Sequence, residues 1–250
     1  MPSFCHFVLK TAGISRLALL LVCVAGTVSL DQGQSAAIHR LRWAEGEPGC
    51  TFSADDDGKY RYGLWTNDVG IILAVDSQEL QKAARRTEPI FTLFLTVHYR
   101  GQDSLSLEPG AISLEFVEHY HDTHPTLDPG VLASHLQNQS ETFARKIEGE
   151  VRKHPEKHDE KQADLQAHLK DVGAMKAFLS DRSLRAATLD RTHPDAAGWI
   201  YFAARNRWVG EWKKREEFVL RIPLQDRVVE FPFALPPSAG DLILRHRTEP

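Results

Sequence analysis

Residues 217–235, EFVLRIPLQDRVVEFPFAL, constrain the fold more than any other stretch of this 250-residue chain. Apolar side chains alternate with polar or small ones on both sides of a short polar break at 225–227. Alternation of period two around such a break is typical of a β-hairpin with one buried face. Pro232 has no N–H to donate, so we expect its strand to lie at a sheet edge or to contain a bulge. An isolated hairpin is only marginally stable, which predicts further strands against its apolar face.

Several other segments have strand character. The clearest is 91–99, FTLFLTVHY, in which every second side chain from Phe91 to Tyr99 faces one way. Further strands are expected near 38–43, 60–64, 70–75, 111–119, 199–203 and 241–246, with one or two helical turns at 77–86. Short strands separated by polar turns predict a mainly β fold, an antiparallel β-sandwich built from 38–127 and 183–250.

Between those two parts, residues 128–182 change to helical spacing. Asp128 followed by Pro129 is typical of a helix start, with an N-cap aspartate and proline at the first helical position. Pro155 ends this helix, and a second is expected from about 156 to 179. The apolar stripes are narrow: Leu132, Leu136, Phe143, Ile147 and Val151 in the first helix, and Leu165, Leu169, Val172, Met175 and Leu179 in the second. We therefore predict an inserted antiparallel helical hairpin whose helices mostly cover each other.

The amino-terminal residues 1–37 have the pattern of a secretory signal peptide. Lys10 and Arg16 precede the apolar run LALLLVCVAGTV at 17–28, which is too short to span a bilayer comfortably. We expect cleavage between 25 and 37 and a secreted or periplasmic product, the alternative being an uncleaved amino-terminal anchor. No later stretch is long and apolar enough for a transmembrane helix, so no integral membrane segment is expected after the signal is removed.

Charge and cysteine content narrow the classes of partner. The net charge is −4, and removing 1–37 makes it more negative because Lys10 and Arg16 leave together with only Asp31. An acidic chain is a poor candidate for nucleic-acid binding, which calls for a basic face. Two of the three cysteines lie in the signal segment, so Cys50 has no intrachain partner and is expected to be buried.

The chain resembles secreted bacterial immunoglobulin-like β-sandwich proteins of no assigned function. The resemblance rests on the signal segment, on FTLFLTVHY with the following PGAISLEF at 109–116, and on FVLRIP and VVEFPF in the carboxy-terminal hairpin. It implies an immunoglobulin-like fold for the β portion. The cysteine pair and central tryptophan of antibody domains are absent, and a shared fold does not imply a shared function.

The histidine-rich segment 118–124, EHYHDTH, is a candidate metal site. On an extended strand His119 and His121 would lie on one face about 7 Å apart, and His124 would fold back as a third ligand. Zinc or copper would suit these ligands. If 91–99 pairs with 111–119, His98 lies too far away to join them. The alternative is a solvated strand end that carries several histidines.

A second candidate site is the loop 205–215, RNRWVGEWKKR. Its tryptophans, Trp208 and Trp212, would stack on sugars, while Arg207 and Lys213 would grip acidic groups. The alternative is that both indoles pack against the sandwich and the cations shield them.

Motifs for other chemistry are lacking. The run Asp55-Asp56-Asp57-Gly58 lacks the bidentate glutamate of a calcium loop and suits a turn better. There is no G-x-S-x-G, P-loop or dinucleotide glycine pattern, so we do not predict an enzyme. The sequence predicts a non-enzymatic secreted or periplasmic protein that binds a protein partner through 129–181. A metal-binding module using His119, His121 and His124, and a carbohydrate-binding module using Trp208 and Trp212, are the alternatives.

Overall fold

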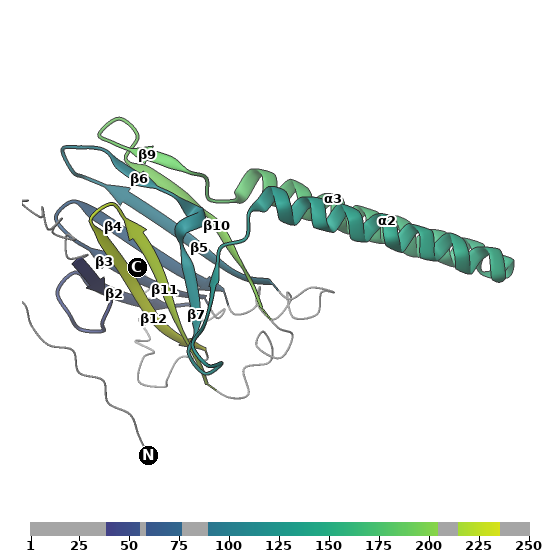
Figure 1. The fold of residues 1–250 in the computed structure, drawn as a ribbon, viewed down its shortest axis with the longest axis horizontal. Helices are drawn as coiled ribbons and strands as arrows, with labels where there is room; N and C mark the ends of the chain where they lie inside the picture. Colours follow the sequence, from purple (N-terminus) through teal and green to yellow (C-terminus); the bar gives the residue numbers. More distant parts are fainter. Residues whose placement is uncertain (1–38, 56–58, 77–89, 205–214, 236–250) are drawn as a thin grey trace, which may run out of the picture. The chain divides into compact units, whose positions relative to one another are not determined.

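Two five-stranded sheets and a pair of long helices make up most of the described part of the protein (Figure 1). The computed structural model describes residues 39–55, 59–76, 90–204 and 215–235. These residues all belong to the unit Ala37–Pro250. The predicted signal peptide (1–37), the helical turns predicted at 77–86, the strand predicted at 241–246 and residues 205–214 of the loop with Trp208 and Trp212 lie outside the described residues. The prediction of a mainly β fold with two inserted helices is confirmed.

The first sheet contains the hairpin that the sequence predicted at 217–235. Its strand order is β1-β12-β11-β7-β8, with β1 parallel to β12 and the other pairs antiparallel. In the hairpin Leu220 lies opposite Phe231, and Gln225 and Asp226 form the turn. The strands are β1 (His39–Arg42), β7 (Ser113–Phe116), β8 (Asp122–Pro125), β11 (Glu216–Leu224) and β12 (Arg227–Leu235).

The second sheet has the order β10-β5-β4-β3-β2 and is antiparallel throughout. Its strands are β2 (Cys50–Ala54), β3 (Lys59–Trp65), β4 (Val69–Asp76), β5 (Ile90–Tyr99) and β10 (Asp195–Ala203). A small sheet pairs β6 (Leu105–Leu107) with β9 (Ala187–Leu189), and a 3₁₀ turn, η1, spans Pro109–Ala111. Because β5 and β7 belong to different sheets, the pairing of 91–99 with 111–119 that we considered does not occur.

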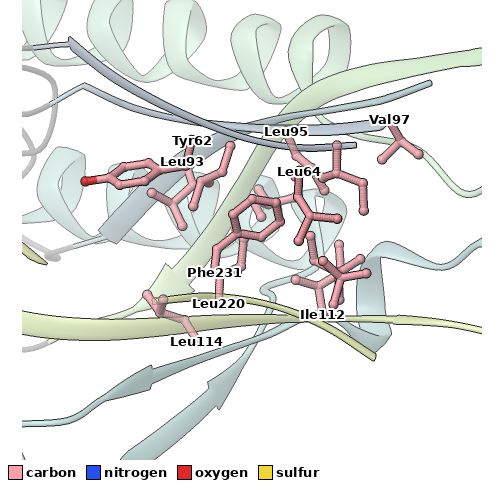
Figure 2. Close-up of a cluster of buried hydrophobic side chains, with 14 of the residues drawn as sticks. Tyr62, Leu64, Leu93, Leu95, Val97, Ile112, Leu114, Leu220 and Phe231 are labelled. Carbon is pink, nitrogen blue, oxygen red and sulfur yellow. The ribbon is translucent and has the colours of Figure 1, made fainter. Parts of the chain in front are cut away.

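The hydrophobic core lies between the two sheets. Phe91 of β5 meets Phe218 of β11, with ring centroids 4.9 Å apart, and Tyr62 of β3 lies 5.9 Å from Phe233 of β12. Figure 2 shows side chains from both sheets pointing toward one another, with Leu93 and Leu95 on one side and Leu114 and Leu220 on the other. The apolar face of the 217–235 hairpin is therefore buried against the opposite sheet, as period-two alternation requires.

The two helices form an antiparallel hairpin between β8 and β9 (Figure 1). They are α2 (Pro129–Lys153) and α3 (His158–Arg182), joined by a 3₁₀ turn, η2 (Pro155–Lys157). The predicted start is confirmed, because Oδ1 of Asp128 accepts a hydrogen bond of 2.9 Å from the backbone N–H of Val131. The predicted break at Pro155 is also confirmed, although the second helix ends later than the sequence indicated.

One member of the predicted apolar stripe is wrong. Leu169 is 42% exposed, and its neighbour His168 occupies the seam instead, with its ring 4.4 Å from that of Phe143. A turn of 3.6 residues places 161, 165, 168, 172, 175 and 179 on one side of α3, so that a histidine rather than a leucine falls on the seam.

The helical hairpin contacts the second sheet at its base, which is the start of α2 and the end of α3. Leu132 at the start of α2 and Leu179 at the end of α3 form a small apolar cluster with Ile90 and Tyr201 of the second sheet. The larger core between the sheets contains no residue of α2 or α3. Within the described ranges, neither these helices nor any other helical segment combines the length and apolar character needed to cross a membrane.

Candidate functional site

The histidine-rich segment is a tight turn rather than an extended strand. β7 ends at Phe116, and β8 begins only at Asp122. Between them Tyr120 and His121 adopt left-handed backbone conformations, with φ of 61° and 57°. Left-handed residues reverse the chain, so the prediction that the strand continues to His119 is wrong, and the two histidines do not share one strand face.

The three histidines of this turn contact three different carboxylates. Nε2 of His119 lies 3.1 Å from Glu216, Nδ1 of His121 lies 2.5 Å from Glu115, and Nε2 of His124 lies 3.1 Å from Asp122. Among the described residues there is no group of three or more His, Cys, Asp or Glu side chains arranged to hold a metal ion. The turn therefore does not bring the predicted zinc or copper ligands together. His98, set aside in the sequence analysis, pairs with Asp195 on β10 at 2.5 Å.

A row of alternating charges crosses the outer face of the first sheet. We call it the charge row and define it as Arg42, Glu230, Arg221, Glu115 and His121, in spatial order. Nη1 of Arg42 donates to Glu230 at 2.9 Å, and Nε of Arg221 donates to the other oxygen of Glu230 at 3.3 Å. Nη2 of Arg221 donates to Glu115, whose second oxygen accepts from Nδ1 of His121. Each arginine and glutamate of the row thus has an opposite charge on the neighbouring strand, and His121 contacts Glu115 from the turn.

The two carboxylates of the charge row are buried although they face outward. Glu115 is 8% exposed and Glu230 is 5% exposed. Burial raises the pKa of Glu115, but the hydrogen bonds from His121 and Arg221 outweigh it, and the pKa of this carboxyl lies below its ordinary value. Burial likewise opposes the charge of Arg221, whereas Glu115 and Glu230 raise its pKa overall. The Glu115 carboxylate and the Arg221 guanidinium therefore both stay ionised at neutral pH.

The sequence analysis did not identify the charge row. Four of its members stand at outward positions of neighbouring strands, between buried residues such as Leu114 and Phe116, and His121 stands in the turn after β7. Opposite charges at outward positions were visible in the sequence. Which of these charges lie side by side depends on strand order and register. The pairing of β1 with β12 brings Arg42 next to Glu230, which lies near the other end of the chain.

A pocket of about 460 Å³ opens beside the charge row. Its lining includes Arg42, Glu115, His121 and Arg221 of the row, together with side chains from the aromatic end of the core: Trp43, Phe52, Tyr62, Phe218 and Phe233. The pocket therefore joins an ion-paired surface to an aromatic one. Mixed apolar and polar linings of this size are typical of small-molecule sites.

The remaining predicted residues divide into two groups. Trp208, Trp212, Arg207 and Lys213 lie outside the described residues. Cys50 is only half-buried, where we expected full burial, and its Sγ accepts a hydrogen bond of 3.5 Å from the backbone N–H of Ala44. No disulfide involves it within the described ranges.

Comparison with protein-family models, with curated proteins and with solved structures found no match to this chain.

Proposed function

We propose that this chain is a secreted or periplasmic, non-enzymatic protein that binds a protein partner through its helical hairpin, residues 129–181. The body that carries the hairpin is, in this proposal, an immunoglobulin-like antiparallel β-sandwich. The observation that carries the proposal is the separation of the two cores. The larger core between the sheets contains no residue of α2 or α3, and the helical hairpin meets the second sheet only in a small cluster at its base. Most of the hairpin surface is then left for contacts with another molecule.

The half of the hairpin farther from its base carries charges of both signs. Between Glu141 and Asp171 lysine and arginine alternate with aspartate and glutamate, whereas 129–140 contain none of these residues. Few of the charges pair closely; Lys161 lies 3.7 Å from Glu150 across the hairpin. Complementary charges contribute specificity and association rate more than affinity. We expect a partner whose surface also carries both signs, and an association that weakens as ionic strength rises.

The chain ends of the hairpin allow a clean deletion. Thr126 forms an isolated β-bridge with Phe202, and Ser183 forms one with Trp199. Both ends of the helical hairpin are therefore held on the same strand, β10. The two anchor points are three residues apart, which is about 10 Å along a strand. A linker of a few glycine and serine residues therefore replaces 129–181 without moving either anchor.

The deletion variant tests the proposal. We expect its sheets to stay folded, with a melting temperature close to that of the intact protein, because the larger core is unchanged. A photo-crosslinking residue at Lys157, at the hairpin turn, should capture a defined partner from the host's exported proteins, and added salt should reduce the capture. The same residue at Arg61 on β3 is the matched control. Capture from position 61 alone, or unfolding of the sheets on deletion, would contradict the proposal.

A further inference from the structure

The pocket beside the charge row occupies a break in the first sheet. β1 pairs with β12 only as far as Arg42 and Glu230, and the backbone N–H of Trp43 makes the last bond, to Glu230 at 2.8 Å. β12 continues to Leu235 beside β11. Among the described residues no strand pairs with β12 on the β1 side past Glu230, and Pro232, which has no N–H to offer, stands there. The chain instead turns away after Trp43, and the pocket lies where the pairing stops.

An aromatic cluster forms the apolar wall of this pocket. Trp43 lies edge-on to Tyr62, with ring centroids 5.0 Å apart, and Phe52 lies 5.0 Å from Tyr62. The indole N–H of Trp43 donates to the carbonyl oxygen of Thr51 at 3.1 Å, which holds the ring in place. Phe52 and Pro232 both line the pocket, and both are only partly buried. The wall is thus rigid, and part of it faces the pocket.

The polar wall presents charged groups of both signs in equal number: Arg42, Arg215 and Arg221 against Glu45, Glu115 and Glu217. Arg42 is 58% exposed at its side chain and donates through Nη1 alone, so Nε and Nη2 have no partner within the described part of the chain. Nε2 of His121 likewise has no partner within the described part of the chain, because the ring binds Glu115 through Nδ1 alone; the side chain is 70% exposed. Glu217, which also lines the pocket, offers carboxylate oxygens, one of which lies 3.5 Å from Nε of Arg215.

We infer that this pocket binds a neutral polyhydroxylated ligand, a short saccharide. Hydroxyl groups both donate and accept, so they fit the spare N–H groups of Arg42 and the spare oxygens of Glu217 without breaking an ion pair. The C–H face of a sugar ring packs on Phe52 and Pro232, which supplies the apolar contact. A ligand carboxylate would bring a negative charge next to Glu115 and Glu217, and a ligand cation would bring a positive charge next to Arg42 and Arg221. Balanced charges therefore favour a ligand that carries none.

Isothermal titration calorimetry on the full-length protein tests the inference. The probes are N-acetylglucosamine, methyl β-galactoside, maltose and cellobiose, with benzoate as the anionic probe. We expect at least one saccharide to bind, benzoate not to bind, and Arg42→Gln to weaken saccharide binding about tenfold. Phe52→Ala should weaken it similarly through lost ring contact. Arg61→Gln is the matched control, because Arg61 is also an exposed arginine paired with a carboxylate, Asp55, but lies outside the pocket lining.

Each outcome decides the inference. Phe52 packs on Trp43 and Tyr62, so melting curves must accompany its variant, and Arg42→Gln, at an exposed position, remains informative if Phe52→Ala unfolds. Silence of all four saccharides overturns the inference. So does binding that is equal in the Arg42→Gln and Arg61→Gln variants, and so does binding of benzoate in place of the sugars. Deleting 129–181 should leave saccharide binding unchanged, which keeps this test independent of the hairpin proposal.

Discussion

The sheets and the helical hairpin are both built from alternating apolar and polar residues, yet they bury them to very different extents. Between the sheets, phenylalanines such as Phe91 and Phe116 are completely buried. In the hairpin only Leu132, Ser140, Ile147 and Leu179 are buried. Two sheets cover each other's inner faces, whereas two helices leave more than half of each surface in solvent. The stability of the fold is therefore concentrated in the sheets, and the hairpin surface is free to serve another purpose.

The sharpest test of this difference compares one phenylalanine from each region. Phe218 lies within 4.9 to 5.5 Å of the rings of Phe91, Phe116 and Phe233. We expect Phe218→Ala to lower the free energy of unfolding by about 3–5 kcal/mol, because it leaves a cavity in a close-packed core. Phe143→Ala, in the half-buried hairpin seam, should cost less than half of that. Urea denaturation followed by tryptophan fluorescence measures both, and equal losses would show that the two regions share one cooperative core.

A smaller change in the free energy of unfolding is expected from the buried carboxylate Glu115, and this change depends on pH. The pKa of Glu115 lies below its ordinary value of 4.5 in the folded protein. A lowered folded-state pKa adds stability that is complete above about pH 4.5 and is lost as the pH falls through the folded value. Glu115→Gln should therefore cost about 1–3 kcal/mol at neutral pH and flatten the loss of stability in acid. Urea denaturation at pH 7 and at pH 3 measures this.

Glu148→Gln is the control for that measurement. Glu148 is exposed on α2, and surface substitutions of this kind change the free energy of unfolding by about 0.5 kcal/mol or less. An unchanged acid dependence in Glu115→Gln, or the same change in both variants, would contradict the assignment of Glu115 as a buried, ionised member of the charge row.

The smallest effect concerns the hairpin seam. Nε2 of His168 is buried and has no hydrogen-bond partner among the described residues, and the ring packs on Phe143. His168→Leu removes this polar atom from an apolar contact and should stabilise the hairpin by about 1 kcal/mol. Amide hydrogen exchange measures protection in α2 and α3 separately from the sheets. Leu169→His on the exposed flank should change little, and a loss of protection in His168→Leu would show that the imidazole is needed.

Periodicity predicted the longer strands and both helices, for a local reason, but it did not predict the short strands β2, β6, β8 and β9. The alternation in 217–235 and 91–99 depends only on which side chains a strand turns inward, and the N-cap of Asp128 depends only on its own helix. The misassigned residues are those whose placement changes when the backbone conformation or the helical register shifts by one or two residues. Two left-handed residues, Tyr120 and His121, reversed the chain, and a shift of one residue placed His168 rather than Leu169 in the seam.

The sequence by itself determined that this protein is mainly β, that one hairpin lies in its core and that two helices interrupt the strands, because each of these follows from the spacing of apolar residues along the chain. Only the tertiary structure decided which strands are neighbours. It separated β5 from β7 and brought Arg42, Glu230, Arg221 and Glu115 together beside an aromatic pocket. The physical reason is that strand pairing is made by backbone groups common to all residues, so the choice of partner is settled by how whole faces pack and not by any local pattern.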